Sequence, residues 1–128
     1  MSNLISLIVP CYNVSATIEK YFDSILSQTY RNIEIIAVDD GSKDRTGEII
    51  DSYTDRFAAN GMKLIHVTQA NRGLGGAINT GLKYVTGDFL CWSDPDDFYY
   101  PEAMEMRLNA LLDLPVYAVV TSDADVFT

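Results

Sequence analysis

Short apolar runs alternate along this chain with longer segments in which apolar residues recur every three or four positions. The short runs are rich in β-branched and aromatic residues and are bounded by turn-forming residues. They predict β-strands at residues 4–9, 33–38, 63–68, 88–92 and 116–121. The longer segments predict amphipathic helices within residues 18–26, 49–57, 74–85 and 104–112. Strand and helix therefore alternate throughout.

Residues near the predicted helix ends agree with this pattern. The expected cap and end positions are Ser15 and Asp44 before two helices, Pro101 in a first turn, and Asn60-Gly61 and Thr86-Gly87 after two helices. Alternating strands and helices, with strands that are almost uninterruptedly apolar, predict an α/β fold. Its sheet is expected to be open and mainly parallel, with helices on both faces.

Composition and charge exclude some classes of function. The chain has 128 residues, 48% of them hydrophobic, and this fits a single domain over residues 1–128. The net charge of −9 and the absence of a Lys/Arg run argue against nucleic acid as a partner. No leader or membrane segment is recognisable, and Cys11 and Cys91 lie in or beside apolar runs, which suits buried thiols. We therefore expect a cytoplasmic protein.

Polar residues follow each of the first four predicted strands. In an open parallel sheet, ligands bind beyond the carboxyl ends of the strands, so these segments are expected to meet at one edge. They are Pro10-Cys11-Tyr12-Asn13, Asp39-Asp40-Gly41-Ser42, Gln69-Ala70-Asn71-Arg72-Gly73 and Ser93-Asp94-Pro95-Asp96-Asp97.

Asp94, Asp96 and Asp97 place three carboxylates within four residues. Their mutual repulsion favours a bound cation or several hydrogen-bond donors. Oxygen ligands suit Mg²⁺ or Mn²⁺, either of which also binds the oxygens of a diphosphate. Alternatively, these aspartates cap the helix near Pro101 or lie in a solvated loop. Their position directly after a predicted strand favours the metal site.

Each of the other polar clusters allows two interpretations. One of Asp39 and Asp40 is expected to cap the following helix, and the other could accept a hydrogen bond from a nucleobase N–H. The glycines after Arg72 could let a phosphate approach a helix N-terminus, or could serve close packing of helix and sheet. Arg72 could contact phosphate, and Tyr12 could stack on a base or belong to the rim of the core.

Four segments taken together resemble family 2 glycosyltransferases in both order and spacing. They are residues 7–13 (LIVPCYN), 38–46 (VDDGSKDRT), 71–81 (NRGLGGAINTG) and 94–97 (DPDD). The resemblance implies the GT-A fold, a Rossmann-like nucleotide-diphospho-sugar transferase fold. It also implies an inverting transfer of sugar from a nucleoside-diphosphate sugar, commonly a UDP-sugar, to a hydroxyl of a sugar or glycolipid acceptor. Cell-envelope polysaccharide or glycoconjugate synthesis is the expected setting, with the cytoplasmic face of the membrane as an alternative location for the parent enzyme.

The resemblance also assigns roles to individual residues. The expected nucleotide-binding residues are Pro10, Tyr12, Asn13, Asp39, Asp40, Arg72, Asp94 and Asp96. Mn²⁺ or Mg²⁺ is expected at Asp96 and Asp97.

The family's catalytic base lies downstream of the Asp-x-Asp segment, so we expect it beyond Thr128. The chain would then be the truncated N-terminal part of a glycosyltransferase domain. A donor-binding module without activity and a nucleotidyltransferase are the alternatives, although the latter's glycine-rich basic loop does not follow the first strand here. A receiver-like signalling domain needs an acidic pair after that strand, where this chain has Pro-Cys-Tyr-Asn.

Overall fold

Parallel strands and helices alternate through the computed structural model, which describes residues 3–113. In chain order the elements are β1 (Ile5–Cys11), α1 (Ile18–Leu26), β2 (Ile33–Asp40), α2 (Thr46–Ala59), β3 (Lys63–Gln69), α3 (Gly73–Leu82), β4 (Phe89–Trp92) and α4 (Ala103–Leu112). The strand order is β3-β2-β1-β4, and each of these neighbouring pairs is parallel. The predicted strand at residues 116–121 lies outside the described residues.

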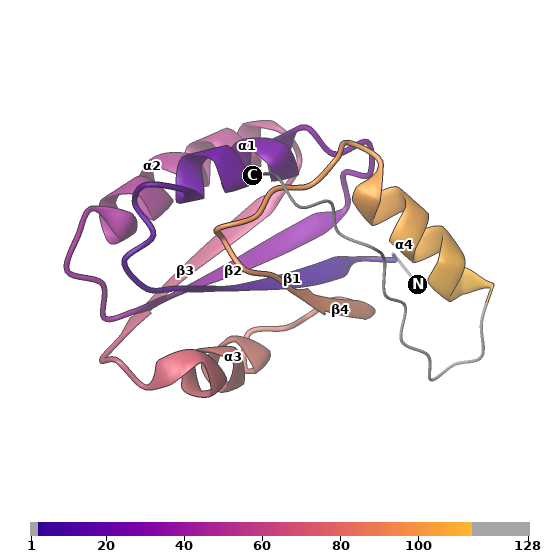
Figure 1. Cartoon of the computed structure of the whole chain (residues 1–128). Helices are drawn as coiled ribbons and strands as arrows, with labels where there is room; N and C mark the ends of the chain where they lie inside the picture. Colours follow the sequence, from indigo (N-terminus) through magenta and orange to yellow (C-terminus); the bar gives the residue numbers. More distant parts are fainter. Residues whose placement is uncertain (1–2, 114–128) are drawn as a thin grey trace.

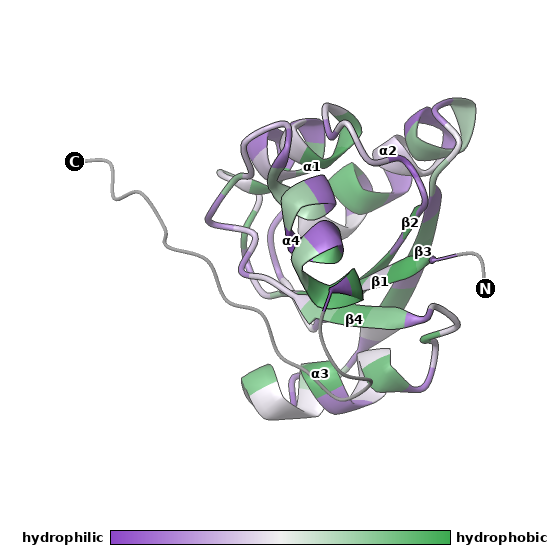
Figure 2. Ribbon diagram, turned by 90° about the vertical axis from the view of Figure 1, so that its right-hand side faces the viewer, coloured by the Kyte–Doolittle hydropathy of each residue, from purple (hydrophilic) through white to green (hydrophobic). Residues whose placement is uncertain are grey.

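Helices cover both faces of the sheet, as the sequence predicts (Figure 1). Helices α1 and α2 lie over one face and α3 lies over the other, while α4 lies beside β4 on the side of α1 (Figures 1 and 2). Side chains of β1 alternate accordingly. Leu7 and Val9 join the core beneath α1 and α2, whereas Ile8 packs with Ile36 and Ala77 beneath α3. No helix among the described residues is long and apolar enough to cross a membrane.

Four of the predicted helix ends differ from the structure. The N-cap positions of α1 and α2 are Thr17 and Arg45 rather than Ser15 and Asp44. Pro101 lies before α4, whose N-cap position is Glu102, and α3 already ends at Leu82. The Asn60-Gly61 end of α2 is confirmed, because Asn60 is its C-cap and Gly61 follows with a φ of 75°. Gly87 has a different role from the predicted one.

Gly87 brings the turn before β4 against β1. A Cβ at this position would lie 2.5 Å from the Leu4 carbonyl oxygen, so only glycine fits. The Gly87 N–H donates to Ser6 Oγ (2.8 Å), and Ser6 Oγ in turn donates to Glu34 Oε2 (2.5 Å). The buried Glu34 carboxylate also accepts hydrogen bonds from the backbone N–H and hydroxyl of Thr86 (2.8 and 2.7 Å). This network fastens β1, β2 and the turn before β4 at the amino ends of the strands.

The Glu34 network makes stability depend on pH. Burial raises the pKa of Glu34, but hydrogen bonds from Ser6 and Thr86 outweigh it and leave the pKa below its ordinary value. Its stabilising contribution is therefore complete above the pKa of the unfolded chain and is lost as the pH falls through the folded pKa. We expect Glu34→Gln to lower the free energy of unfolding by roughly 1–3 kcal/mol at neutral pH.

Urea unfolding from neutral to acidic pH checks this expectation. The difference between wild type and Glu34→Gln should shrink as the pH falls below the ordinary glutamate pKa of 4.5. Glu48→Gln, an exposed change on α2, serves as the control. A difference that stays constant with pH would show that the charge of Glu34 has no part in the effect.

Candidate functional site

The carboxyl ends of β1 and β2 and the start of α3 enclose an open cavity of about 250 Å³. The residues that line it are Pro10, Cys11, Tyr12, Asp40, Asn71, Gly73, Leu74 and Ala77. The structure thus brings Pro10, Tyr12 and Asp40 together, as the sequence predicts. The volume falls below the ~300–1,000 Å³ of a complete small-molecule site, which suits a cavity that receives one part of a larger ligand.

Asp39 and Asp40 point to opposite faces of the sheet, because β2 continues through both of them. Asp39 lies on the α2 side, where its Oδ1 accepts a hydrogen bond from the Ser42 N–H (3.0 Å). Asp40 lies on the α3 side and borders the cavity. The structure therefore separates Asp39, which holds the turn before α2, from Asp40 at the cavity. Neither aspartate caps α2, because the N-cap position of this helix is Arg45 and has no side-chain cap hydrogen bond. A contact between Asp39 and a nucleotide stays a prediction.

Asp40 is buried and fixes the loop that leads into α3. Its Oδ1 accepts from Gln69 Nε2 (2.9 Å) and from the Arg72 N–H (2.8 Å), and its Oδ2 accepts from the Gly73 N–H (3.0 Å). Two backbone donors at the start of the helix are thus already paired with a carboxylate. Arg72 contributes its N–H here, and its guanidinium does not line the cavity; its contact with phosphate stays a prediction.

Asn13 holds two loops together instead of lining the cavity. Its backbone N–H donates to Ser42 Oγ (2.9 Å), and its Oδ1 accepts from the Lys43 N–H (2.8 Å). Asn13 has a φ of 51°, a conformation that asparagine tolerates better than most residues. The loop after β1 is therefore bonded to the loop after β2, directly beside Tyr12. The predicted contact of Asn13 with a nucleotide remains untested.

Asp44 strengthens the same connection. Its Oδ2 accepts from the Ser15 N–H (3.1 Å), and its Oδ1 accepts from the N–H and hydroxyl of Thr46 (3.0 and 2.6 Å). Burial raises the pKa of Asp44, but these hydrogen bonds lower it by more than burial raises it. The pKa therefore lies well below its ordinary value. Ser15 and Asp44, which the sequence analysis assigns to two separate helix caps, thus lie in one contact between loops.

The acidic loop after β4 lies beside the end of β1. The Ser93 N–H donates to the Ile8 carbonyl (3.1 Å), and Thr17 Oγ1 at the start of α1 donates to Asp96 Oδ1 (3.0 Å). Burial raises the pKa of the Cys11 thiol, and the carboxylates of Asp39 and Asp94 raise it further. Cys11 therefore lies between the acidic ends of β2 and β4 and carries no charge at neutral pH.

The side chains of Asp94, Asp96 and Asp97 are exposed. Asp94 Oδ1 accepts from the Asp96 N–H (3.0 Å), and the Asp97 N–H donates to the Asp94 carbonyl (3.1 Å), so the segment forms a tight turn. Within residues 3–113, no three carboxylate, histidine or cysteine side chains gather where they could hold a metal ion. A cation at Asp96 and Asp97 would thus need further oxygen ligands, which a diphosphate could provide.

Sequence comparison decides the family. The sequence model of the family described as glycosyl transferase family 2 matches residues 6–126. The chain belongs to glycosyl transferase family 2. An uncharacterized glycosyltransferase of Rickettsia typhi is 43% identical over 110 residues, which are 86% of this chain and 32% of the relative. The uncharacterized glycosyltransferase EpsJ of Bacillus subtilis is 48% identical over 109 residues, 85% of this chain and 30% of EpsJ. The chain thus spans about a third of the length of these relatives.

Solved structures agree with the family assignment. Residues 1–349 of S. aureus TarS form a similar structure, with a TM-score of 0.74 and 30% identity; the match covers 86% of this chain and 32% of that TarS fragment. TarS has also been solved in complex with UDP and with UDP-GlcNAc. The mannosyltransferase PcManGT of Pyrobaculum calidifontis, in complex with GDP-Man and Mn²⁺, gives a TM-score of 0.70 at 28% identity, covering 84% of this chain and 31% of PcManGT. The predicted GT-A fold is confirmed.

Two residues of the cavity at the strand ends received no individual role from the sequence. Asn71 and Leu74 line it, and Leu74 is 66% exposed. Asn71 lies there because Gly41, with a φ of 78°, lets the loop after β2 approach it. A Cβ on Gly41 would lie 2.9 Å from the Asn71 nitrogen. The sequence indicated Asn71 only as part of the polar segment after the third strand. The approach of Asn71 to Gly41 is a tertiary contact, which local sequence patterns do not predict.

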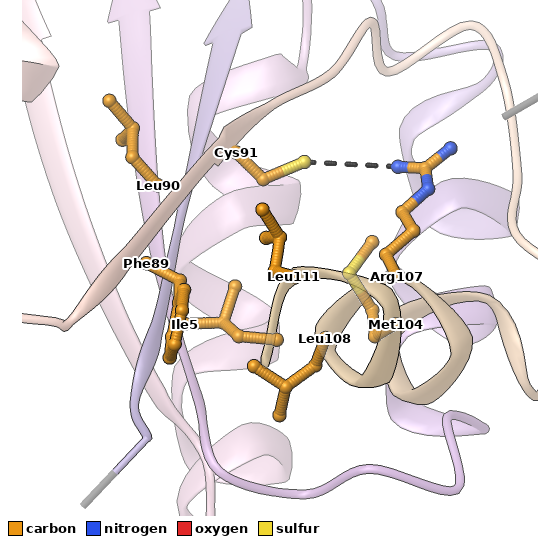
Figure 3. A pocket seen from close by; sticks show the side chains of 8 residues that line it. All are labelled: Ile5, Phe89, Leu90, Cys91, Met104, Arg107, Leu108 and Leu111. Carbon is orange, nitrogen blue, oxygen red and sulfur yellow. Dashed lines mark hydrogen bonds between the residues drawn. The ribbon is translucent and has the colours of Figure 1, made fainter. Parts of the chain in front are cut away.

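A second cavity, between β4 and α4, has a different character. It measures about 70 Å³ and is lined mostly by apolar side chains, among them Ile5, Phe89 and Leu108 (Figure 3). Its polar contact is a hydrogen bond from Arg107 Nη1 to Cys91 Sγ (3.8 Å). It contains none of the predicted site residues and is too small for a nucleotide, so the cavity at the strand ends is the candidate site.

Asn13 provides a test of the contact between the loops. Asn13→Ala removes the acceptor for the Lys43 N–H and places alanine in the left-handed region. We therefore expect the free energy of unfolding to fall by about 1–2 kcal/mol. Asn13→Asp keeps an acceptor and tolerates the same backbone, so it should stay within about 0.5 kcal/mol of wild type. Urea unfolding measures both values. Equal stability of Asn13→Ala and wild type would show that this contact does not stabilise the loops.

Proposed function

We propose that the cavity at the strand ends binds the nucleotide of a nucleoside-diphosphate sugar and forms the donor site of an inverting glycosyltransferase. The observation that carries this proposal is the convergence of Pro10, Tyr12 and Asp40 in one cavity beside the acidic loop. Membership of family 2 supports it, as do the UDP, UDP-GlcNAc and GDP-Man complexes of TarS and PcManGT.

The cavity suits a base and ribose. Tyr12 is 49% exposed at its wall, so its ring is available to stack on a base. Asp40 offers a carboxylate oxygen at the same wall and could accept an N–H of uracil or guanine. A UDP-sugar is our preferred donor, because TarS was solved with UDP-GlcNAc and is 29% identical in that complex.

The diphosphate would lie toward the acidic loop. Asp96 and Asp97 would hold Mn²⁺ or Mg²⁺, and the exposure of both side chains fits a site that a diphosphate completes. The bound cation would neutralise charge on the departing nucleoside diphosphate. Thr17 would orient Asp96 through its hydroxyl group.

The reaction would be a single displacement at the anomeric carbon, with inversion, by a hydroxyl group of a sugar or glycolipid acceptor. A general base must take the proton of that hydroxyl. By the family resemblance we expect this base beyond Thr128, and we expect the whole enzyme to act in cell-envelope polysaccharide or glycoconjugate synthesis at the cytoplasmic side of the membrane.

Binding of a nucleotide should depend on Asp97 and on a divalent cation. Calorimetric titration with UDP and GDP, with and without Mn²⁺, is expected to show binding that Mn²⁺ strengthens by roughly tenfold or more. Asp97→Ala should lose this Mn²⁺ effect. Asp55→Ala, which removes an exposed carboxylate from α2, should retain it. Absence of binding by the folded wild-type chain with either nucleotide and Mn²⁺ would refute the proposed donor site.

Base recognition should depend on the ring of Tyr12. Stacking of a base on an aromatic side chain is worth about 1–3 kcal/mol, so Tyr12→Ala should weaken UDP binding roughly 5- to 150-fold. Tyr12→Phe keeps the ring and should bind nearly as wild type does. Tyr84→Ala is the control, because Tyr84 lies just after α3, at the opposite edge of the sheet. Unchanged affinity of Tyr12→Ala would place the base elsewhere.

A further inference from the structure

The two oxygens of the Asp40 carboxylate accept different numbers of hydrogen bonds. Each carboxylate oxygen can accept about two hydrogen bonds. Oδ1 already accepts two, from Gln69 Nε2 and the Arg72 N–H, whereas Oδ2 accepts one, from the Gly73 N–H. Oδ2 therefore retains capacity for another donor at a carboxylate that borders the cavity.

Gln69 is one of the donors that hold this carboxylate, and it comes from the neighbouring strand. Asp40 and Gln69 are partners in the parallel register of β2 and β3, so a rigid sheet sets the distance between them. Because a carboxylate only accepts hydrogen bonds, the Gln69 amide must present its NH₂ group to Asp40 and its oxygen away from it. That oxygen lies 2.5 Å from Thr80 Oγ1 on α3, which donates to it.

Thr80, Gln69 and Asp40 thus form a chain of hydrogen bonds from α3 to the cavity. The Gly76 carbonyl, one turn earlier in the helix and 3.0 Å from Thr80 Oγ1, is a second acceptor for the single hydroxyl proton, and the Gln69 oxygen is the nearer of the two. Both ends of the Gln69 amide are therefore paired. Gln69 does not line the cavity, and Asp40 is the cavity residue that its side chain contacts.

We propose that Gln69, oriented by Thr80, is a positioning residue for base recognition: it holds Asp40 so that Oδ2 offers its remaining acceptor position to an N–H of the base. This inference rests on the proposed donor site. A group held by side chains of the sheet and a helix is placed more precisely than one held by a loop alone. The selectivity for a base with an N–H donor would then depend on a residue that touches no ligand.

Gln69→Glu tests this role, because its effect should depend on pH. At neutral pH the introduced carboxylate repels Asp40 and cannot donate a hydrogen bond to it, so the affinity for UDP in the presence of Mn²⁺ should fall roughly tenfold or more. At about pH 5 the introduced group, whose pKa the neighbouring carboxylate raises, is partly protonated and can donate as glutamine does. The ratio of variant to wild-type affinity should therefore recover toward one.

Three further variants separate positioning from general damage. Gln69→Leu keeps the size of the side chain without a donor, and should lose affinity roughly fivefold at both pH values. Thr80→Val should lose less affinity, because it removes the hydrogen bond that orients the Gln69 amide but keeps the amide itself. Thr68→Glu introduces the same charge one residue earlier, on the opposite face of β3, and should bind as wild type does. Thermal unfolding of each variant confirms that it is folded.

The outcomes distinguish the two proposals. If the folded wild-type chain binds neither UDP nor GDP with Mn²⁺, the proposed donor site fails, and this inference fails with it. If wild type binds but Gln69→Glu and Gln69→Leu bind equally well at neutral pH, the donor site stands and the positioning role of Gln69 is overturned. Loss of affinity by a folded Gln69→Glu without recovery at about pH 5 overturns it as well.

Discussion

The parallel alignment of β1 between β2 and β4 is the constraint on which the rest of the structure depends. Pairing of residues 5–11 with residues 33–39 on one side, and of residues 5–8 with residues 89–92 on the other, brings the carboxyl ends of these strands to one edge. Because helices cover both faces, β1 is buried almost throughout, and its register cannot slip without exposing apolar side chains. Every group of the proposed donor site lies in a loop, at a strand end or at the start of α3, all at that edge.

Strand alternation then decides what neighbouring residues can do. Asp39 and Asp40 are adjacent in sequence, yet one holds the turn before α2 and the other holds the loop before α3 and borders the cavity. The sequence pattern ends the second strand at residue 38, two residues early, so it could not assign the two carboxylates. A search for apolar runs does not find a charged side chain that packs in the sheet. Such a side chain is tolerated there because hydrogen bonds replace the missing apolar contacts.

The sequence alone predicts much of the fold and part of the site. The alternating pattern locates all eight described elements to within a few residues, since strand and helix periods differ clearly. Pro10, Tyr12 and Asp40 meet as expected because strand ends meet in any parallel sheet. Asn13, Asp44 and the approach of Gly41 to Asn71 could not be predicted, because each depends on which two loops face each other. Cap preferences describe local partners, and these partners lie some 30 residues away.

Charge also bears on where the diphosphate of the proposed donor would lie. The glycine-rich start of α3 would ordinarily attract phosphate through its free N–H groups. Here the Arg72 and Gly73 N–H groups already bond to the Asp40 carboxylate, whose negative charge would repel a phosphate. In the donor site that we propose, the diphosphate would therefore lie toward Asp96 and Asp97. Carboxylates would accept a diphosphate there only through a shared cation, so the contacts of Asp40 agree with the metal dependence that we propose for the donor site.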